Sequence, residues 1–410
     1  MPDERVAQMD AAETPPTSAR QPVPEPGIEP FPVSIPERAL EDLRGRLDRV
    51  RLPEAETAQD GTQGVGLQRL RSLLDAWREH DWRSLEKRWN AIPHYRTGLD
   101  GLSIAFWHVR SPEPDAFPLV LTHGWPGSVL EFESVIGPLT DPVAHGGSAA
   151  DAFNVVVPAL PGFGFSERPR ELGWNPGRTA RAWAELMARL GYQRFGAHGG
   201  DWGAPVSIEL ARSVPERVAA LHLTMPFAWP LPEDLATADD AERGMIAKRD
   251  RFMMTGPTHA IVQGVVPQTL GYSLLDSPAG LAAWLSEALV AFSDTRPEAG
   301  GGVSVAQQLD DIAVYWFTGT GASAARWYWE AMRWIPRGAE AQNAQTVTVP
   351  TAFTLFPAEP FPTAQRWAEH RYHNLISWNE MPYGGHYPGW EHPGLLVSEI
   401  RDAFRQARDR

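Results

Sequence analysis

A carboxylate stands at the centre of a glycine-rich turn, where residues 199–203 read Gly-Gly-Asp-Trp-Gly. An apolar run ends at Gly199 and a helix-forming run begins near Ala204, so we expect a strand, a tight turn and a helix. Such a turn holds its central side chain at the top of a sheet and at a helix N-terminus, which favours a negative charge. Asp201 is therefore a candidate nucleophile, with a simple N-cap of the helix as the alternative.

Two backbone N–H groups could stabilise an oxyanion beside this carboxylate. The segment Thr-His-Gly-Trp-Pro-Gly-Ser at 122–128 follows an apolar, strand-like run. A loop in this place donates one N–H to an oxyanion hole, and the residue after the nucleophile donates the other. These donors would be Trp125 and Trp202, although a simple Gly/Pro-rich turn has the same composition as 122–128.

An acid and a histidine follow Asp201 in the chain order that a triad on such a sheet requires. Glu359 comes just after the strand-like run Thr-Ala-Phe-Thr-Leu-Phe, and His386 follows the last predicted strand. Each residue alone is more typical of a surface position, because loop glutamates are common and the chain has 12 histidines. The order and context of all three residues together predict a catalytic triad.

An aspartate in place of a serine points to chemistry at a saturated carbon. A carboxylate is a weak base but a competent nucleophile at a strained or activated carbon. Attack on an epoxide would form an ester on Asp201, and His386, oriented by Glu359, would activate the water that hydrolyses this ester. The same nucleophile would suit a haloalkane dehalogenase, and a non-catalytic or biosynthetic relative is a third interpretation.

The composition restricts the class of protein. The 410 residues carry a formal net charge of -14, which disfavours nucleic acid and acidic membrane surfaces as partners. The absence of cysteine excludes disulfides and thiolate chemistry. No apolar run approaches the roughly 20 residues that span a bilayer. We expect a soluble cytoplasmic enzyme that acts on a small molecule without metal or cofactor, with a homodimer as one open assembly.

The order of predicted elements is typical of an α/β protein with a mostly parallel sheet. Residues 1–29 are rich in Pro, Glu and Ala, and we expect a mobile arm. A mainly helical block follows at 30–110, and strands alternate with helices over 111–227. Helices alone occupy 228–340, and strands return in 341–410. This order predicts a split core with an inserted helical lid.

Several longer motifs carry a family resemblance from about residue 30 onward. They are HGWPGS, PALPGFGFS, GGDWG and GGHYPGWEHP in the core, and LDSPAGLAAW and YWFTGT in the lid. In combination they resemble the microsomal-type branch of the epoxide hydrolases. The resemblance implies an α/β-hydrolase fold with an inserted lid and an N-terminal helical meander, and an apolar epoxide as substrate. Trp125, Trp202 and Trp327 would wall the apolar pocket that such a substrate needs.

Carried over position by position, the resemblance makes Asp201 the nucleophile, His386 the general base and Glu359 the acid that orients it. The family also uses two lid tyrosines that donate hydrogen bonds to the epoxide oxygen. Tyr328 matches one of them, but Pro257 stands where the other is expected, in Thr-Gly-Pro-Thr-His. Proline has no side-chain donor, so the sequence departs from the family at this point.

The departure at Pro257 leaves three interpretations open. Tyr328 alone activates the epoxide, a neighbour such as His259 or Thr258 supplies the second donor, or the substrate opens without one. Pro257 and His259 are in each case expected at the substrate pocket.

Overall fold

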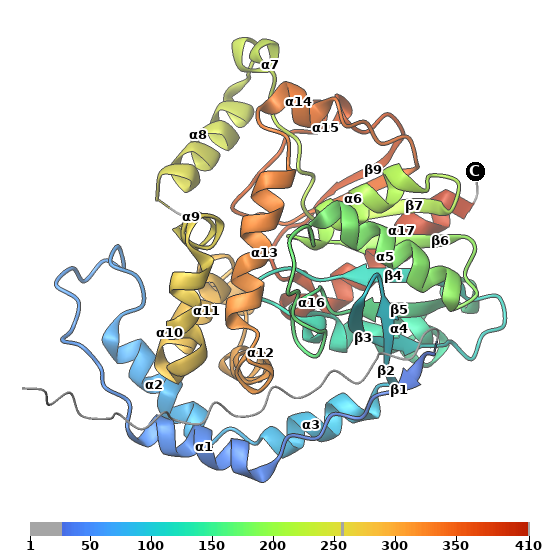
Figure 1. Ribbon diagram of the computed structural model, residues 1–410. Coiled ribbons are helices and arrows are strands. Elements are labelled where there is room, and N and C mark those ends of the chain that lie inside the picture. The colour runs from blue at the N-terminus through green and yellow to red at the C-terminus, as the bar shows by residue number, and fades with distance from the viewer. Residues whose placement is uncertain (1–26, 256–257, 409–410) are drawn as a thin grey trace, which may run out of the picture.

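The computed structural model describes residues 27–255 and 258–408 (Figure 1). The predicted arm 1–29 lies almost entirely outside the described residues, and Pro257 lies outside them as well. Within the described part, one nine-stranded sheet forms the centre of the molecule and helices surround it.

The sheet has the strand order β1-β2-β3-β5-β4-β6-β7-β8-β9. The pairs from β1 to β5 are antiparallel, and the pairs from β5 through β9 are parallel. The strands are β1 (Glu29–Pro30), β2 (His94–Leu99), β3 (Leu102–Val109), β4 (Phe117–Thr122), β5 (Phe153–Pro158), β6 (Phe195–Gly199), β7 (Val218–Leu223), β8 (Thr351–Leu355) and β9 (Leu375–Glu380). The central strands are short apolar runs because a parallel sheet is covered by helices on both faces.

The helices of the core cover the two faces of the sheet in pairs. α5 packs on α6 over one face, and α4 packs on α17 over the other (Figure 1). The core helices are α4 (Glu133–Thr140), α5 (Pro176–Arg189), α6 (Gly203–Ser213), α14 (Ala339–Asn343), α15 (Gln365–Glu369), α16 (Pro388–Glu391) and α17 (Pro393–Arg408). Because β4, β6, β8 and β9 belong to the parallel part of the sheet, their carboxyl ends lie at the same edge, where the loops that follow them can converge.

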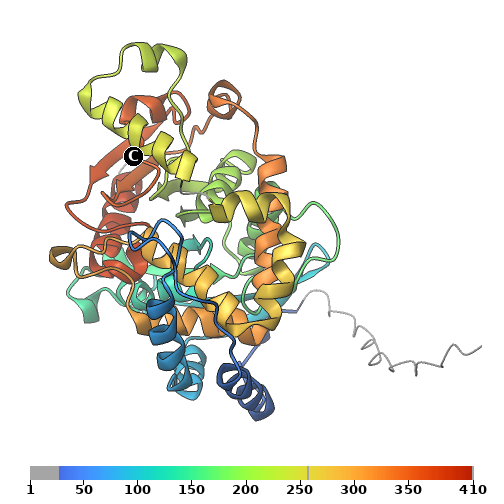
Figure 2. The same cartoon turned by 90° about the vertical axis from the view of Figure 1, so that its left-hand side faces the viewer.

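A helical lid separates β7 from β8, as the sequence predicts. Its helices are α7 (Pro232–Ala236), α8 (Asp240–Thr255), α9 (Thr258–Val265), α10 (Pro267–Asp276), α11 (Pro278–Ala291), α12 (Val305–Thr318) and α13 (Gly321–Trp334). α13 packs against both α9 and α10, and α11 packs against α12. Figure 2 turns the lid toward the viewer, with its yellow and orange helices in front of the core.

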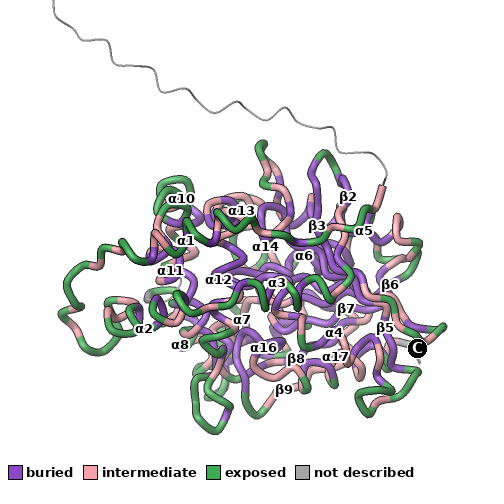
Figure 3. Tube along the Cα trace, turned by 90° about the horizontal axis from the view of Figure 1, so that it is seen from below, coloured by how far each residue is buried: buried purple, intermediate pink, exposed green. Residues whose placement is uncertain are grey.

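Three N-terminal helices support the lid from outside. They are α1 (Glu37–Asp48), α2 (Leu67–Arg78) and α3 (Trp82–Ala91). In α1, Leu40, Leu43 and Leu47 recur at helical spacing and are all buried. α1 and α2 contact α11, and α3 contacts α12, while their outer faces are exposed (Figure 3). The N-terminal block therefore holds the lid against the core.

The structure confirms the predicted α/β class, with its mostly parallel sheet, helical lid and N-terminal helices. The exact divisions at 110, 227 and 340 stay predictions.

Candidate active site

Asp201 lies on a sharp turn between β6 and α6. Its backbone φ is 43°, a left-handed conformation that is uncommon outside glycine. The flanking glycines allow the turn to close. A Cβ atom on Gly199 would lie 2.2 Å from the carbonyl oxygen of Gly203, and one on Gly203 would lie 1.8 Å from that of Thr122. The turn therefore has the strained strand-to-helix geometry that the motif predicts.

The loop after β4 lies directly against the Asp201 carboxylate. The backbone N–H of Trp125 donates a hydrogen bond of 2.7 Å to Asp201 Oδ1. A Cβ atom on Gly124 would lie 2.2 Å from the same oxygen, so only glycine allows this approach. Trp202 follows Asp201 at the N-cap position of α6. The two predicted oxyanion donors thus come from the two loops that frame the nucleophile.

The histidine and the acid of the predicted triad meet at the same edge of the sheet. His386 Nδ1 lies 2.7 Å from Glu359 Oε2, and its Nε2 lies 3.4 Å from Asp201 Oδ2. Glu359 Oε1 accepts the backbone N–H of Phe361 at 3.2 Å, which fixes the carboxylate. Among the described residues, His386 Nε2 has no hydrogen-bond partner. This nitrogen is therefore free to engage a water or a reacting group.

Two carboxylates control the charge of His386. Burial alone would lower the pKa of the imidazole, but the negative charges of Glu359 and Asp201 outweigh it and raise the pKa well above its usual value. The resting site therefore favours an imidazolium between two carboxylates, and loss of the charge on Asp201 would bring the pKa of His386 down.

Aromatic rings enclose the nucleophile from the lid side. The Tyr328 ring meets the rings of Trp202 and Trp125 edge-on, with centroids 4.8 and 5.7 Å apart. The Trp327 ring lies edge-on to that of Trp202 at 6.5 Å. The His259 ring stacks on Trp125 at 4.9 Å and meets Tyr328 edge-on at 5.7 Å. The structure thus brings these five residues together around Asp201.

Protonation leaves two donors in this aromatic wall. Burial, and then the charge of Asp201, raise the pKa of Tyr328 well above its usual value, so its O–H form persists. Burial lowers the pKa of His259 to about 4 despite the opposing charge of Asp201, so its imidazole is neutral near pH 7. A neutral imidazole still carries one N–H donor. Tyr272 is 68% exposed and takes no part in the wall.

Glu131 is a further buried carboxyl beside the loop of Trp125, and no sequence motif marks it. Its Oε1 lies where a Cβ atom of Gly127 would be, at 1.6 Å, so the carboxyl presses against the loop that carries Trp125. Burial raises the pKa of Glu131 from 4.5 to about 8, and Asp201 adds to this shift while His386 opposes it. A lone glutamate inside an apolar run gave no signal for this role.

Lid segments hold the two loops that carry Glu359 and His386. The backbone N–H of His386 donates to the carbonyl oxygen of Phe292 at 2.9 Å. The N–H of Gly384 donates to Asp294 Oδ2 at 3.0 Å. Lys248 Nζ donates to the carbonyl oxygen of Glu359 at 2.7 Å. These contacts join residues about a hundred positions apart, and local sequence patterns do not reveal them.

Comparison with known proteins agrees with the fold. The chain matches the family model for the epoxide hydrolase N terminus over residues 28–132 and the model for the alpha/beta hydrolase fold over residues 118–253. Among solved structures, the juvenile hormone epoxide hydrolase of Bombyx mori has a TM-score of 0.83 at 25% identity and covers 93% of this chain and 95% of that chain. The Aspergillus niger epoxide hydrolase has a TM-score of 0.82 at 28% identity, and the match covers 93% of this chain and 97% of that chain. The fold is that of the α/β-hydrolase superfamily.

Sequence relatives narrow the class further. The chain is 46% identical over 385 residues to a Stigmatella aurantiaca protein that is provisionally named an epoxide hydrolase, covering 93% of this chain and 86% of that protein. It is 35% identical to epoxide hydrolase 1 of Oryctolagus cuniculus, and this match covers 91% of this chain and 88% of that protein. The protein belongs to the epoxide hydrolase family and is a hydrolase. Within the described residues, no helix has both the length and the apolar character needed to cross a membrane.

Proposed function

We propose that this protein opens an apolar epoxide to a vicinal diol through a covalent ester on Asp201. The observation that carries the proposal is the arrangement of Asp201, His386 and Glu359. His386 Nε2 lies 3.4 Å from Asp201 Oδ2, and Nδ1 lies 2.7 Å from Glu359. Asp201 attacks as a carboxylate and needs no base to remove a proton. A base beside it therefore serves a later step, and the later step of this route is the hydrolysis of the ester.

In the first step, an oxygen of Asp201 attacks one epoxide carbon. The C–O bond of the ring breaks as the ester bond forms, and the ring oxygen takes a proton as it leaves. Tyr328 and neutral His259 face the same space above Asp201, and both have a proton to share. We assign His259 as the second donor, in place of the side chain that Pro257 lacks.

In the second step, His386 activates water. Ester formation removes the negative charge of Asp201, so one of the two charges that raise the pKa of His386 disappears. The imidazolium, oriented by Glu359, then gives up its proton, which restores the donor that lost one in the first step. The neutral imidazole accepts a proton from water. The resulting hydroxide adds to the ester carbonyl carbon. The tetrahedral intermediate then collapses with cleavage of the bond between this carbon and the ester oxygen, which releases the diol and restores the Asp201 carboxylate. The N–H groups of Trp125 and Trp202 would stabilise the oxyanion that forms.

An isotope experiment tests the covalent route. Repeated turnover of styrene oxide in ¹⁸O-labelled water should place label in the Asp201 carboxylate, because hydrolysis at the ester carbonyl leaves one water oxygen on Asp201 and releases the former Asp201 oxygen in the diol. Mass spectrometry of the peptide that contains Asp201 measures it, and enzyme incubated without epoxide is the control. Diol formation with an unlabelled Asp201 would contradict the route. Halide release from chloroalkanes without any diol formation would instead favour the dehalogenase alternative.

The two proposed donors can be tested as a pair. Tyr328→Phe and His259→Phe should each lower kcat for styrene oxide by about 100-fold, the usual loss for one oxyanion donor. The exposed Tyr272→Phe should leave kcat unchanged, as a matched control. Equal rates for His259→Phe and the wild type would show that Tyr328 acts without His259.

A further inference from the structure

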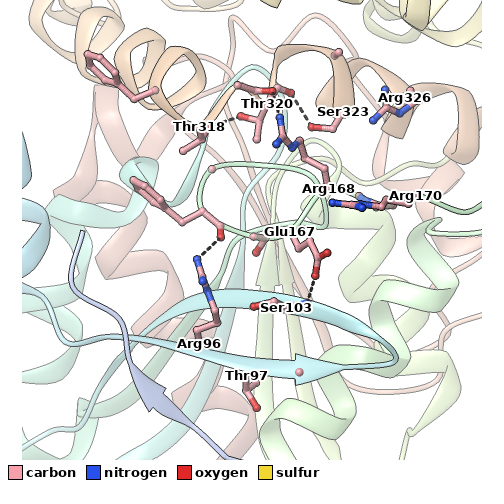
Figure 4. Close-up of a pocket in the computed structure, with 18 of the residues that line it drawn as sticks. Arg96, Thr97, Ser103, Glu167, Arg168, Arg170, Thr318, Thr320, Ser323 and Arg326 are labelled. Carbon is pink, nitrogen blue, oxygen red and sulfur yellow. Dashed lines mark hydrogen bonds between the residues drawn. The ribbon is translucent and has the colours of Figure 1, made fainter. Parts of the chain in front are cut away.

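A cavity of about 850 Å³ opens at the seam between the core and the lid, away from Asp201. Its walls come from the β2–β3 hairpin, the loop 164–170 and the lid helices α10, α12 and α13 (Figure 4). This volume is in the range of small-molecule sites. The polar side chains that decide its character are Arg96, Glu167, Arg168, Arg170, Gln268 and Arg326.

Three arginines give this cavity an excess of positive charge. Figure 4 shows Arg168, Arg170 and Arg326 on the same side of the cavity. Arg168 donates to the carbonyl oxygen of Gly319 at 3.2 Å, and Arg326 donates to Gln268 Oε1 at 3.2 Å. Both of these acceptors are neutral. Among the described residues, no carboxylate forms an ion pair with any of the three arginines.

The acids of the cavity lie elsewhere. Glu167 accepts the backbone N–H of Ser103 at 3.1 Å, and Figure 4 shows its carboxylate turned toward the hairpin. Glu167 and Glu29 lie near the fourth arginine, Arg96. Burial lowers the pKa of Arg96, and the charges of these two acids oppose that shift. The negative charge in the cavity thus compensates Arg96 and leaves the other three arginines uncompensated.

Arg326 is placed at an electrostatic cost. Burial lowers the pKa of its guanidinium, and the nearby charge of Arg168 lowers it further. Two close guanidinium groups, one of them partly withdrawn from water, are stabilised when an anion binds between them. The net charge of the chain is -14, so such a concentration of unpaired positive charge is contrary to its general charge balance.

A second, less polar pocket of about 650 Å³ adjoins the first and shares Arg170, Gln268 and Arg326 with it. Its walls include Leu172, Trp174, Val266, Trp327 and Trp329. Leu172, Val265 and Val266 all line this pocket and are 74%, 64% and 45% exposed, so apolar surface is open to solvent here.

The two acids of the second pocket have partners of their own. Glu171 pairs with Arg178 at 3.0 Å, and Glu330 accepts the backbone N–H of Gly173 at 3.1 Å. The shared arginines therefore face an apolar wall on one side and a polar cavity on the other.

We propose that the two pockets together bind an amphipathic organic anion. Its carboxylate or phosphate head lies among Arg168, Arg170 and Arg326, and its apolar chain lies along Leu172 and Trp174. Trp327 lines the second pocket and also belongs to the aromatic wall beside Asp201, so the two sites share this side chain. The head group lies away from Asp201, because residues two positions apart on a helix point about 200° apart. Arg326 therefore leaves α13 on nearly the opposite side from Tyr328.

Binding of decanoate, decyl phosphate and decanol to the full chain tests the proposal, measured by calorimetry. The two anions should bind at least about 10-fold more tightly than the neutral alcohol, because each adds charge-assisted hydrogen bonds to the same apolar contact. The double variant Arg170→Gln/Arg326→Gln should lose this preference and keep its affinity for decanol. Arg38→Gln/Arg71→Gln, which changes two exposed arginines of α1 and α2, is the matched control and should keep the preference.

Three results would overturn the proposal. The first is equal affinity for decanoate, decyl phosphate and decanol in the wild type. The second is an anion preference that survives in Arg170→Gln/Arg326→Gln. The third is binding of inorganic phosphate as tight as that of decyl phosphate, which would leave no role for the apolar wall. The ratio of decanoate to decyl phosphate affinity identifies the preferred head group. None of these outcomes depends on the epoxide reaction.

Discussion

At the scale of single residues, charge links Asp201, the proposed nucleophile, to His386, the proposed base. Asp201 and Glu359 hold a proton on His386 in the resting site, and the proposed ester would remove one of these two charges. His386 therefore keeps its proton while Asp201 is charged and loses it more readily once the proposed ester has formed. In the proposed reaction, this coupling would keep His386 protonated until Asp201 has reacted.

The variant Asp201→Asn imitates the uncharged state of the ester. The pKa of His386 should fall, because burial still disfavours the imidazolium and only Glu359 now favours it. The shift should exceed about one pKa unit, the effect typical of a carboxylate in near contact. NMR titration of ¹⁵N-histidine measures it, with the signal of the exposed His145 as internal control. An unchanged His386 titration would show that Asp201 does not control the base.

At the scale of elements, the lid holds the loops that carry Glu359 and His386. α8 reaches the acid-bearing loop through Lys248, whose ammonium donates to the carbonyl oxygens of Glu359 and Pro357. The segment after α11 holds the loop of His386 through Phe292 and Asp294. The N-terminal helices α1–α3 in turn pack on α11 and α12. The triad geometry therefore depends on helices that carry none of its members.

The variant Lys248→Met tests this dependence. The variant keeps the length of the side chain but removes both hydrogen bonds to the loop of Glu359. A less firmly held Glu359 should lower kcat by about 3- to 10-fold with little change in KM. The free energy of unfolding should fall by about 1 kcal/mol. Steady-state kinetics and thermal unfolding measure the two effects. Lys87→Met on α3 is the matched control, since Lys87 is exposed. A kcat equal to that of the wild type would show that α8 does not position Glu359.

At the scale of the whole molecule, the active-site carboxyl that titrates near neutrality affects stability. Glu131 has its pKa raised from 4.5 to about 8 by burial and nearby carboxylates. The folded state therefore binds this proton more tightly than the unfolded state. Its contribution to stability is complete below pH 4.5 and is lost as the pH rises through about 8.

The variant Glu131→Gln removes this titration while keeping the shape of the neutral side chain. The free energy of unfolding of the wild type, relative to the variant, should fall by more than about 1.4 kcal/mol between pH 5 and pH 9, the value of one pKa unit. Urea unfolding at several pH values measures it. The exposed Glu54→Gln should show no such trend relative to the wild type. A constant difference between wild type and Glu131→Gln would contradict a protonated Glu131.

The sequence by itself determined the features that short patterns encode. The Gly-Gly-Asp-Trp-Gly turn required glycine at its flanks for steric reasons, and the structure shows the same crowding at Gly199 and Gly203. Apolar runs and helical spacing predicted the α/β class and the lid. The order of Asp201, Glu359 and His386 predicted which residues to bring together, because such loops meet at the carboxyl edge of a parallel sheet.

Only the tertiary structure decided what depends on contacts between distant segments. No periodic or local pattern predicts three of these contacts. They are the contact of Glu131 with Gly127, the hydrogen bond from Lys248 to the carbonyl oxygen of Glu359, and the stacking of His259 on Trp125. Arg168 and Arg170 lie on a core loop and Arg326 lies on α13, so the cavity that they line exists only after the lid has packed on the core. Long-range packing sets distances and local electrostatics, and these decide protonation and binding, whereas local patterns set only which element each residue occupies.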